Sequence, residues 1–420
     1  MRALVLVALH GALVVTFARA PIRHVPSLRT MPRGRASIAA GASSTEPTTA
    51  SRKRPASAAQ GEEPGSGKKG KAPAEEDAPA SKVAGAALVT DDKKGGRAVQ
   101  LASREVVPRA PTPRAPAPPS PEDALTLTSW NVGGLRSWLA SDERRAELTV
   151  TVLASPAPDV LFLLETKLQA GKIEDEAKAA LAQCLPGYEA YFTSSSAKKG
   201  YSGVCALVRT AATLGGIEPI YGIGECDDEG RALTLPIRRP GCAPLDVVCC
   251  YVPNSGEGLK RLAYRLDTWD PALRSYLRAR AAAPGRPQVC LLGDLNVAHL
   301  DSDIWNWGPS ASKNKALEKN AGLTPGERAS FTQMLAECEL TDAFRALHPE
   351  AQGCFSYWSV RASGRSVNRG LRLDYALVSA AIASASGSAL GWALHDAFTL
   401  DETNTRGDHA PVGVTLVPKK

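Results

Sequence analysis

Several short apolar runs in this sequence end in a residue whose side chain can bind a cation or a phosphate. An isolated buried charge is costly, and buried carboxylates persist when they are paired or bound to a metal. Residues that follow strands also lie where the binding sites of α/β sheets form. We therefore expect these side chains to converge on one site. They are Asn131 after LTLTSW, Glu165 after DVLFLL, Asp294 and Asn296 in GDLN, Asp374 in LRLDY, and Asp408 and His409 before the last apolar run.

Most donor atoms in this set are carboxylate and amide oxygens. Hard divalent cations prefer such ligands, whereas zinc sites use clusters of Cys and His. The set therefore predicts a Mg²⁺ site in which Mn²⁺ can substitute. Simpler explanations stay open, because a carboxylate at a strand end is common and because Asp and Asn in GDLN also favour a plain turn.

The elements that must position these residues have the pattern of an α/β protein, in which runs of strand length alternate with helical stretches. Continuous apolar runs such as 160–164 are typical of strands buried on both faces. Many connections are loops or hairpins, so the pattern favours mixed sheets, two of them packed together, over a wound parallel sheet. The predicted strands span 125–130, 160–164, 204–208, 232–237, 246–251, 289–292, 373–378 and 412–417.

Three helices are predicted, over 142–153, 259–280 and 325–337. The third has the clearest signal. Thr324 can cap it, Pro325 occupies the first helical position, and Glu327 stands three residues after the cap.

The first 124 residues have a different composition from the rest of the chain. They contain no Trp or Tyr and are rich in Ala, Pro and Ser, so they cannot bury enough apolar surface to offset the entropy of ordering. We expect a targeting segment over 1–45, a disordered basic and Pro-rich linker over 46–124, and one folded domain over 125–420.

The tail also carries possible targeting signals. An apolar run over 3–17 precedes an Arg-rich stretch with no acidic residue before Glu46, as in proteins imported into a mitochondrion or plastid. The basic clusters 52–54 and 68–71 are typical of nuclear localisation. An untargeted tail explains the same composition, so the compartment stays open between the nucleus and a DNA-containing organelle. The apolar run is too short to span a membrane, and we expect the mature form to have no membrane partner.

The net charge of +7 lies in the tail. Residues 1–124 carry 19 basic and 11 acidic residues, whereas the remainder carries 31 and 32. The folded part must therefore bind any phosphate through a local basic face. The nine cysteines are an odd number without C-x-x-C spacing, which indicates reduced core residues.

Nine short motifs occur in order between residues 125 and 417. They are SWNVGGLR from Ser129, LETK from Leu164, GYSGV from Gly200, EGR from Glu229, YVPNSG from Tyr251, GDLNVAH from Gly293, NAGLTP from Asn320, NRGLRLD from Asn368 and GDHAP from Gly407. In order and approximate spacing they resemble the exonuclease III and apurinic/apyrimidinic endonuclease family.

This resemblance implies a fold, a reaction and a partner. The fold would be a four-layer α/β sandwich of two packed mixed sheets flanked by helices. The activity would be a Mg²⁺-dependent hydrolase that incises double-stranded DNA 5′ to abasic sites in base excision repair, with 3′-exonuclease or 3′-phosphodiesterase activity in some members. The enzyme would act as a monomer.

The resemblance also implies roles for individual residues. Glu165 would be the principal metal ligand, and Asp294 would orient or deprotonate the attacking water. His409 would contact a phosphate oxygen, with its tautomer fixed by Asp374. Tyr251 would stabilise the attacking or departing oxygen. The implied metal group comprises Asn131, Glu165, Asp294, Asn296, Asp408 and His409.

Substrate contacts form a second implied group. Asn296 and Asn254 would hold the phosphate, and Asn320 would also contact the substrate. An abasic deoxyribose would enter an apolar pocket, because a missing base has no stacking to lose. The pocket walls would be Tyr357, Trp358, Leu371 and Leu373, although these four residues could equally be ordinary core.

Departures from the family pattern keep two alternatives open. Gly133 replaces an Asp or Asn, Leu164 replaces a Gln before the metal glutamate, and Glu257 replaces an Arg that contacts DNA in some members. One alternative is the same fold acting on RNA ends, protein–DNA adducts or phosphoinositides, against which the NAG and NRGLRLD motifs speak. The other is an inactive homologue that tethers nucleic acid, which the complete set of polar residues disfavours.

Overall fold

The computed structural model describes residues 8–9, 12–13 and 106–419, except 154–156, 213, 225, 385–390 and 402–406. The strands β1 (Ala8–Leu9) and β2 (Ala12–Leu13) pair with each other in antiparallel orientation. The remainder of the predicted targeting segment and the linker up to residue 105 lie outside the described residues.

Two six-stranded mixed sheets form the centre of the domain. In the first sheet, of order β13-β14-β3-β4-β6-β5, the parallel pair is β3 with β4. Its strands are β3 (Leu125–Asn131), β4 (Val160–Leu164), β5 (Tyr188–Thr193), β6 (Val204–Arg209), β13 (Trp392–Thr399) and β14 (Val412–Pro418).

The second sheet has the order β11-β12-β10-β9-β8-β7, and its parallel pair is β9 with β10. Its strands are β7 (Ile220–Tyr221), β8 (Ala232–Ile237), β9 (Leu245–Cys250), β10 (Gln288–Asp294), β11 (Leu340–Asp342) and β12 (Asp374–Ser379).

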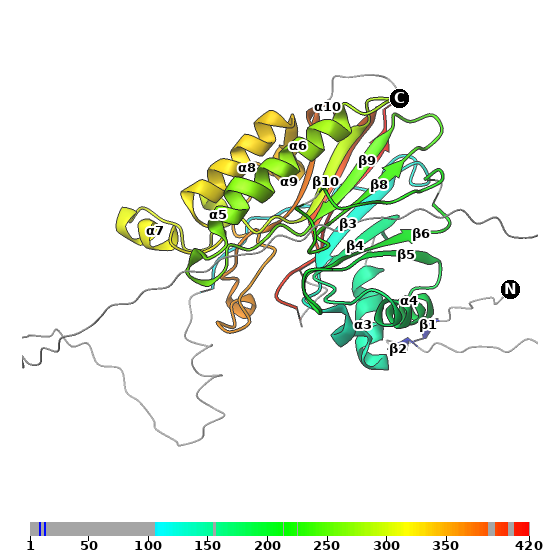
Figure 1. Cartoon of the computed structure of the whole chain (residues 1–420), viewed down its shortest axis with the longest axis horizontal. Helices are drawn as coiled ribbons and strands as arrows, with labels where there is room; N and C mark the ends of the chain where they lie inside the picture. The colour runs from blue at the N-terminus through cyan, green and yellow to red at the C-terminus, as the bar shows by residue number, and fades with distance from the viewer. Residues whose placement is uncertain are drawn as a thin grey trace, which may run out of the picture. The chain divides into compact units, whose positions relative to one another are not determined.

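Helices cover the outer faces of both sheets, which gives four layers (Figure 1). Side chains of α2, α3 and α4 pack on the first sheet, and those of α6 and α8 pack on the second. In the described part of the chain no helix is both long and apolar enough to cross a membrane. The helices are α2 (Leu135–Leu139), α3 (Asp142–Val152), α4 (Lys172–Cys184), α5 (Leu262–Tyr264), α6 (Asp270–Ala281), α7 (Ala311–Leu317), α8 (Pro325–Glu337), α9 (Ala343–Leu347) and α10 (Ala380–Ala383).

The sequence of β4 shows why the central strands are continuously apolar. Phe162 and Leu164 point into the core between the sheets, whereas Leu161 and Leu163 pack under the helices. Both faces of the strand are thus removed from water, so no position in it favours a polar residue. The predicted four-layer sandwich with two mixed sheets is confirmed.

Individual elements differ from the prediction in two ways. The helix predicted over 259–280 is interrupted, since a π-turn over Arg265–Trp269 separates α5 from α6. Pro271 at the start of α6 lacks the N–H that a continuous helix requires. In addition, β5, β7, β11 and β13 were missed, because they lie at the edges of the two sheets and do not have a continuous apolar run.

The Pro-rich segment before the domain was expected to be disordered, and its last part is not. Residues 106–124 run along the domain without regular secondary structure and bond to it repeatedly. Arg114 pairs with Asp396 at 2.7 Å, and Arg239 donates to the carbonyl of Glu122 at 2.7 Å. The ordered part of the chain therefore begins before residue 125.

Candidate active site

Residues at the ends of four strands meet at one edge of the sandwich. Asn131 ends β3 and Glu165 follows β4, both in the first sheet. Asp294 ends β10 and Asp374 begins β12, where they are register partners in the second sheet. His409 lies just before β14 and completes the group. The structure thus brings together side chains that the sequence places far apart.

The amide of Asn131 connects the two sheets. Its Nδ2 donates to Glu165 Oε1 at 3.1 Å and to Asp294 Oδ2 at 3.0 Å. Its Oδ1 accepts from the backbone N–H of Gly133 at 3.0 Å. Because Asn131 is only 1% exposed, this amide is fixed, and it holds the two carboxylates at a set separation.

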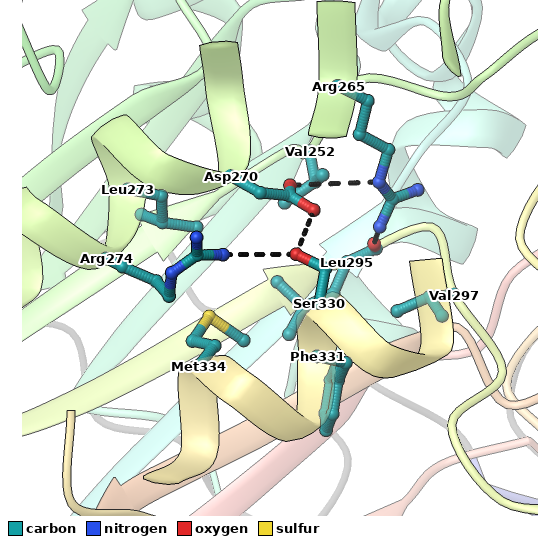
Figure 2. A pocket seen from close by; sticks show the side chains of 10 residues that line it. All are labelled: Val252, Arg265, Asp270, Leu273, Arg274, Leu295, Val297, Ser330, Phe331 and Met334. Atoms are coloured by element: carbon teal, nitrogen blue, oxygen red, sulfur yellow. Dashed lines mark hydrogen bonds and ion pairs between the residues drawn. The ribbon is translucent and has the colours of Figure 1, made fainter. Parts of the chain in front are cut away.

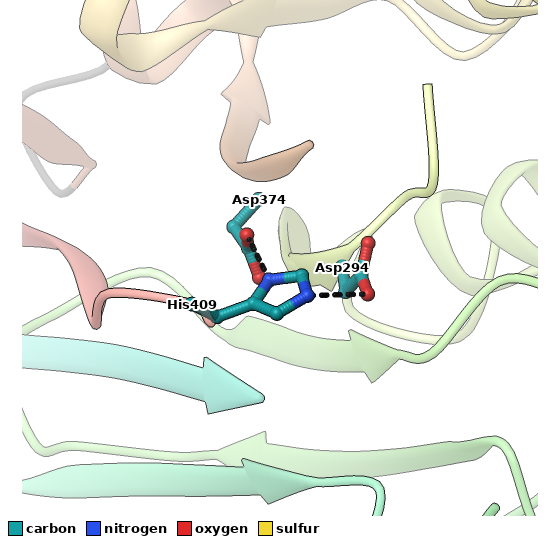
Figure 3. A group of neighbouring side chains, drawn as sticks. All are labelled: Asp294, Asp374 and His409. Carbon is teal, nitrogen blue, oxygen red and sulfur yellow. Dashed lines mark hydrogen bonds and ion pairs between the residues drawn. The ribbon is translucent and has the colours of Figure 1, made fainter. Parts of the chain in front are cut away.

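The imidazole of His409 lies between two carboxylates (Figure 3). Its Nδ1 is 2.7 Å from Asp374 Oδ2, and its Nε2 is 3.9 Å from Asp294 Oδ2. The backbone N–H of Asp374 donates in turn to Ser356 Oγ at 2.9 Å. Asp374 therefore fixes the ring and directs Nε2 toward Asp294.

The charges of this group shift its protonation. Burial alone would lower the pKa of His409, but Asp374 and Asp294 outweigh it and raise that pKa to about 10. Burial, and then repulsion from Asp374, raises the pKa of Asp294 to about 7. These shifts favour the protonated form of His409 and make Asp294 a stronger proton acceptor than an ordinary carboxylate.

Glu165 is held ionised by three neighbours. Burial raises its pKa, but hydrogen bonds from Lys167, Tyr251 and Asn131 together lower it below the usual value. Tyr251 donates its hydroxyl to Glu165 Oε1 at 2.6 Å, and Lys167 Nζ is 2.8 Å from Oε2. Glu165 has φ 52°, in the left-handed region. Such backbone strain is found where a fixed side-chain direction is required.

The loop after β10 is fixed by its own polar groups. The N–H of Asn296 donates to Asp294 Oδ1 at 2.9 Å, and its Nδ2 donates to the carbonyl of Val252 at 2.9 Å. Asn254 Nδ2 donates to Asn296 Oδ1 at 2.8 Å. The GDLN segment therefore forms a turn, and the hydrogen bonds of this turn fix the side chains of Asp294, Asn296 and Asn254.

A small cavity of about 20 Å³ lies behind this loop (Figure 2). Arg265 crosses one side of it and donates to the carbonyls of Asn296 at 2.6 Å and Leu295 at 2.7 Å. On the other side Ser330 donates to Asp270 at 2.6 Å. This volume holds about one water molecule. The cavity therefore belongs to the support of the loop and is too small for a substrate.

The residues on the open side of the site fit a hard divalent cation. A cavity of about 560 Å³ reaches Glu165 and Asp408. Their carboxylates are oxygen donors of the kind that Mg²⁺ and Mn²⁺ prefer, and the buried amide of Asn131 bonds to Glu165 behind them. Lys167 Nζ lies 2.8 Å from Glu165 Oε2 and 3.0 Å from the carbonyl of Gly133. The oxygens around Glu165 thus already stabilise the positive charge of Lys167.

The other residues of the predicted metal group lie deeper. Asp294 and His409 have ligand atoms within 4.8 Å of one another and of Asp374, and all three side chains are buried. The imidazole Nδ1 faces Asp374, and Asn296 Oδ1 accepts from Asn254. These contacts favour proton transfer and phosphate binding over metal binding for this inner group.

Three of the four predicted pocket residues lie together. Tyr357, Leu371 and Leu373 belong to one apolar cluster, in which Leu373 is buried and the other two are partly exposed. Tyr357 and Leu371 bond to each other through their backbones at 2.9 Å. The ring of Tyr357 lies 5.0 Å from that of His409. This cluster therefore adjoins the catalytic group.

Trp358 lies outside the cluster of Tyr357, Leu371 and Leu373, and Asn320 lies in the loop between two other members of that cluster, Leu317 and Leu323. Trp358 is 2% exposed and packs with Phe355 in a separate cluster, so it supports the loop and does not line the apolar cluster. Its neighbour Tyr357 points the opposite way, as expected for successive residues of an extended segment. Asn320 is exposed, and its Nδ2 donates to the carbonyl of Leu317 at 2.9 Å, so its contact with the substrate stays a prediction.

Three residues of the site had no role in the sequence prediction. Lys167 pairs with the metal-ligand candidate Glu165, and Ser356 accepts the N–H of Asp374. Arg231 is 1% exposed and lies under the ring of Tyr251, with its Cζ 4.6 Å from the ring centroid. Lys167 and Arg231 occur in the LETK and EGR motifs, which was the available signal. Nothing in the sequence distinguishes Ser356 from other serines.

Residues 128–409 match the endonuclease/exonuclease/phosphatase family. The chain is 38% identical over 264 residues to the DNA repair nuclease APEX1 of Danio rerio, covering 61% of this chain and 74% of that protein. It is 36% identical over 257 residues to an exodeoxyribonuclease of Bacillus subtilis, covering 61% of this chain and 88% of that protein.

The chain is also similar in fold to solved structures of nucleases. The AP endonuclease of Leishmania major aligns with a TM-score of 0.62 and 29% identity, covering 76% of this chain and 98% of that one. A 3′-5′ exonuclease of Neisseria meningitidis aligns with a TM-score of 0.54 and 25% identity, covering 70% of this chain and 100% of that one.

Proposed function

This chain belongs to the endonuclease/exonuclease/phosphatase family, and we propose that it is a Mg²⁺-dependent DNA repair phosphodiesterase that incises duplex DNA 5′ to abasic sites. Its similarity to an AP endonuclease and to exodeoxyribonucleases supports DNA as the substrate. The observation that carries the proposal is the network in which Asn131 joins Glu165 to Asp294, beside His409 and Asp374.

Asp294 and His409 carry out the proton and charge chemistry of this proposal. A pKa near 7 allows Asp294 to accept a proton from an attacking water at neutral pH. Attack on a phosphodiester adds negative charge to the phosphate oxygens. The protonated Nε2 side of His409 faces Asp294 and can donate to such an oxygen. Asp374 keeps the imidazole charged and oriented.

Neutral donors complete the proposed phosphate site. The amides of Asn254 and Asn296 touch each other at 2.8 Å, so both can face one phosphate group. Tyr251 keeps its proton, because burial and the charge of Glu165 raise its pKa well above the usual value, and its hydroxyl donates that one hydrogen to Glu165 Oε1 beside the phosphate site. A divalent cation held by Glu165, Asp408 and Asn131 would supply Lewis-acid stabilisation of the departing oxygen.

The apolar cluster supports an abasic sugar as the group recognised. Tyr357 and Leu371 are partly exposed beside His409, which gives a deoxyribose without a base an apolar surface next to the phosphate chemistry. A flipped base would lose its stacking, whereas a missing base has none to lose. The two amides and the cation would bind the same phosphate in any substrate, so the cluster is the feature that favours abasic DNA.

An incision assay tests the proposal. The substrate is a labelled duplex with one tetrahydrofuran abasic analogue, and the expected product ends immediately 5′ of the lesion in the presence of Mg²⁺ or Mn²⁺. Glu165→Ala and His409→Ala should remove the activity. Cleavage of RNA ends, protein–DNA adducts or phosphoinositides without incision of this duplex would assign another substrate, and inactivity on all of them would indicate a nucleic-acid tether. Similarity to a 3′-5′ exonuclease makes a recessed 3′ end the second substrate to assay.

We also propose that the enzyme acts as a monomer in the nucleus or in a DNA-containing organelle. The basic and Arg-rich clusters of residues 1–71 support import into one of these compartments. Fluorescent fusions with and without residues 1–45 test the compartment, and light scattering of the purified chain tests the monomer.

A further inference from the structure

The segment 106–111 lies outside the family match, yet it contacts the loop that carries Tyr357. The N–H of Val107 donates to the carbonyl of Val367 at 3.0 Å, and the N–H of Ala110 donates to that of Gln352 at 2.8 Å. These two bonds bind the segment to both ends of residues 352–368. The approach is close, because a Cβ on Gly353 would meet the carbonyl oxygen of Pro108 at 2.1 Å.

Asn368 transmits this contact into the loop. Its Nδ2 donates to the carbonyls of Val107 at 3.2 Å and Gly353 at 2.8 Å. Its Oδ1 accepts from Trp358 Nε1 at 3.2 Å. Asn368 adopts φ 51°, a conformation that Asn tolerates better than most residues. One side chain therefore joins segment 106–111 to the indole of Trp358.

Trp358 in turn lies beside the catalytic turn. Its backbone N–H donates to the carbonyl of Asp408 at 2.8 Å. Its indole packs with Phe355 and Ala410, and Val107 packs against the same cluster. The residue before it, Tyr357, forms a β-bridge to His409. The contacts thus run without interruption from Val107 through Trp358 to the residues on either side of His409.

We propose that residues 106–111 are an intramolecular brace that positions the Tyr357 loop and the Asp408–His409 turn for catalysis. The proposal rests on the proposed function for its effect on activity. A brace of this kind limits the opening of the loop, because three backbone or amide bonds and an apolar contact must break together. Arg109 strengthens it through an ion pair with Asp401. Any processing of the tail must then cut before Val106 to leave the brace intact.

The test uses substitutions in the full chain. Asn368→Ala removes the bonds to Val107, Gly353 and Trp358, and Val107→Ser removes the apolar contact. Arg114→Ala is the matched control, since it breaks the contact of the same segment with Asp396 at 2.7 Å and leaves residues 106–111 in place. Truncations before residue 106 and after residue 111 provide a second comparison.

Hydrogen exchange over residues 353–371 and incision of the tetrahydrofuran duplex are measured on each protein. We expect faster exchange in this loop and a loss of about tenfold or more in kcat/KM for the two brace variants and the longer truncation. The control and the shorter truncation should match the full chain in exchange, in kcat/KM and in melting temperature. Unchanged exchange in the loop after removal of residues 106–111 would overturn the brace. If the full chain does not incise the duplex, the proposed function fails, and the exchange comparison alone decides.

Discussion

His409 Nδ1 lies 2.7 Å from Asp374 Oδ2, and both side chains are almost fully buried. The other oxygen of Asp374 has no hydrogen-bond partner among the described residues. Among the described side chains, the Asp374 carboxylate therefore forms its hydrogen bond with the imidazole of His409. It keeps the ring protonated and turned toward Asp294, which is the arrangement that phosphate binding requires.

The first prediction is that Asp374→Asn lowers kcat by about 10²- to 10³-fold, the loss expected for one preorganised donor. The amide keeps the shape of the carboxylate but cannot stabilise the charge on His409. Single-turnover incision of the tetrahydrofuran duplex measures the effect. Asp396→Asn is the control, because Asp396 is equally buried but pairs with Arg114. Wild-type rates in Asp374→Asn would show that the pair is structural.

The second prediction concerns Asn131, whose Nδ2 bridges Glu165 and Asp294. Asn131→Ala leaves two buried carboxylates without their shared donor, so we expect weaker Mn²⁺ binding and a rate loss of about 10²-fold or more. Calorimetric titration with Mn²⁺ measures the first effect without any activity. Gln333→Ala is the control, since this exposed amide donates to Glu337 along helix α8 and belongs to neither the metal group nor the substrate group. Unchanged Mn²⁺ affinity would contradict the role of Asn131.

The third prediction is a bell-shaped dependence of kcat/KM on pH. Asp294 must be deprotonated to accept a proton, so activity should rise as the pH passes its pKa of about 7. His409 must stay protonated to bind a phosphate oxygen, so activity should fall as the pH approaches its pKa of about 10. Rates between pH 5 and 10.5 at constant ionic strength give both limbs. A profile without an acid limb would remove Asp294 from the role of base.

The part of the fold that sequence predicted is the part that is buried on both faces. Strands such as β4 and β8 were predicted with the correct bounds, because all of their positions except Pro236 are buried. The edge strand β13 was missed, because its central positions Ala393 to His395 are only partly buried and a bulge lies between Leu394 and Asp396. Its pairing depends on its neighbour β14 more than on its own sequence.

The site residues could likewise be predicted only where the local sequence determines their position. Residues at the ends of apolar runs, such as Glu165 and Asp294, could be found from position and type. The role of Asn131 as the bridge between them could not, because that role depends on the packing of two separate sheets. The packing of Trp358 with Phe355, Ala410 and Val107 could not be found from the sequence for a related reason, since composition does not show which apolar surface a segment meets.

The fourth prediction concerns stability in acid. Asp303 is fully buried and bonds to Arg372 and Arg345. Burial raises its pKa, but the two arginines outweigh it and lower the pKa below the usual value. This stabilisation is present above the unfolded-state pKa near 3.8 and is lost as the pH falls through the lower folded-state value. Urea unfolding should therefore show stability falling steeply below about pH 4.

The matching variant is Asp303→Asn, which leaves Arg372 buried with one charged partner fewer. We expect it to be destabilised by about 3 to 5 kcal/mol at pH 7 and to lose less stability than the wild type on acidification. Asp301→Asn is the control, because Asp301 is exposed and pairs at the surface with Arg328. Equal acid sensitivity of Asp303→Asn and the wild type would show that other carboxylates cause the loss.

The fifth prediction assigns a positioning role to Arg231. Its guanidinium lies under the ring of Tyr251, donates to the carbonyl of Tyr251 at 3.0 Å and to the hydroxyl of Tyr201 at 3.0 Å, and pairs with Glu229 at 2.6 Å. These contacts fix the direction in which Tyr251 donates to Glu165 at 2.6 Å. Since lysine keeps the charge but cannot bond to three acceptors in one plane, Arg231→Lys should lower kcat by about tenfold with little change in KM.

A double-mutant cycle with Tyr251→Phe separates positioning from a general loss of packing. If Arg231 acts through the hydroxyl of Tyr251, then Arg231→Lys should cost little more once that hydroxyl is gone, so the two effects will not add. A packing defect would lower the rate by the same factor in both backgrounds, because removal of one oxygen leaves the ring over the guanidinium. Additive losses in the cycle, with unchanged melting temperature, would therefore show that Arg231 influences catalysis by a route other than Tyr251.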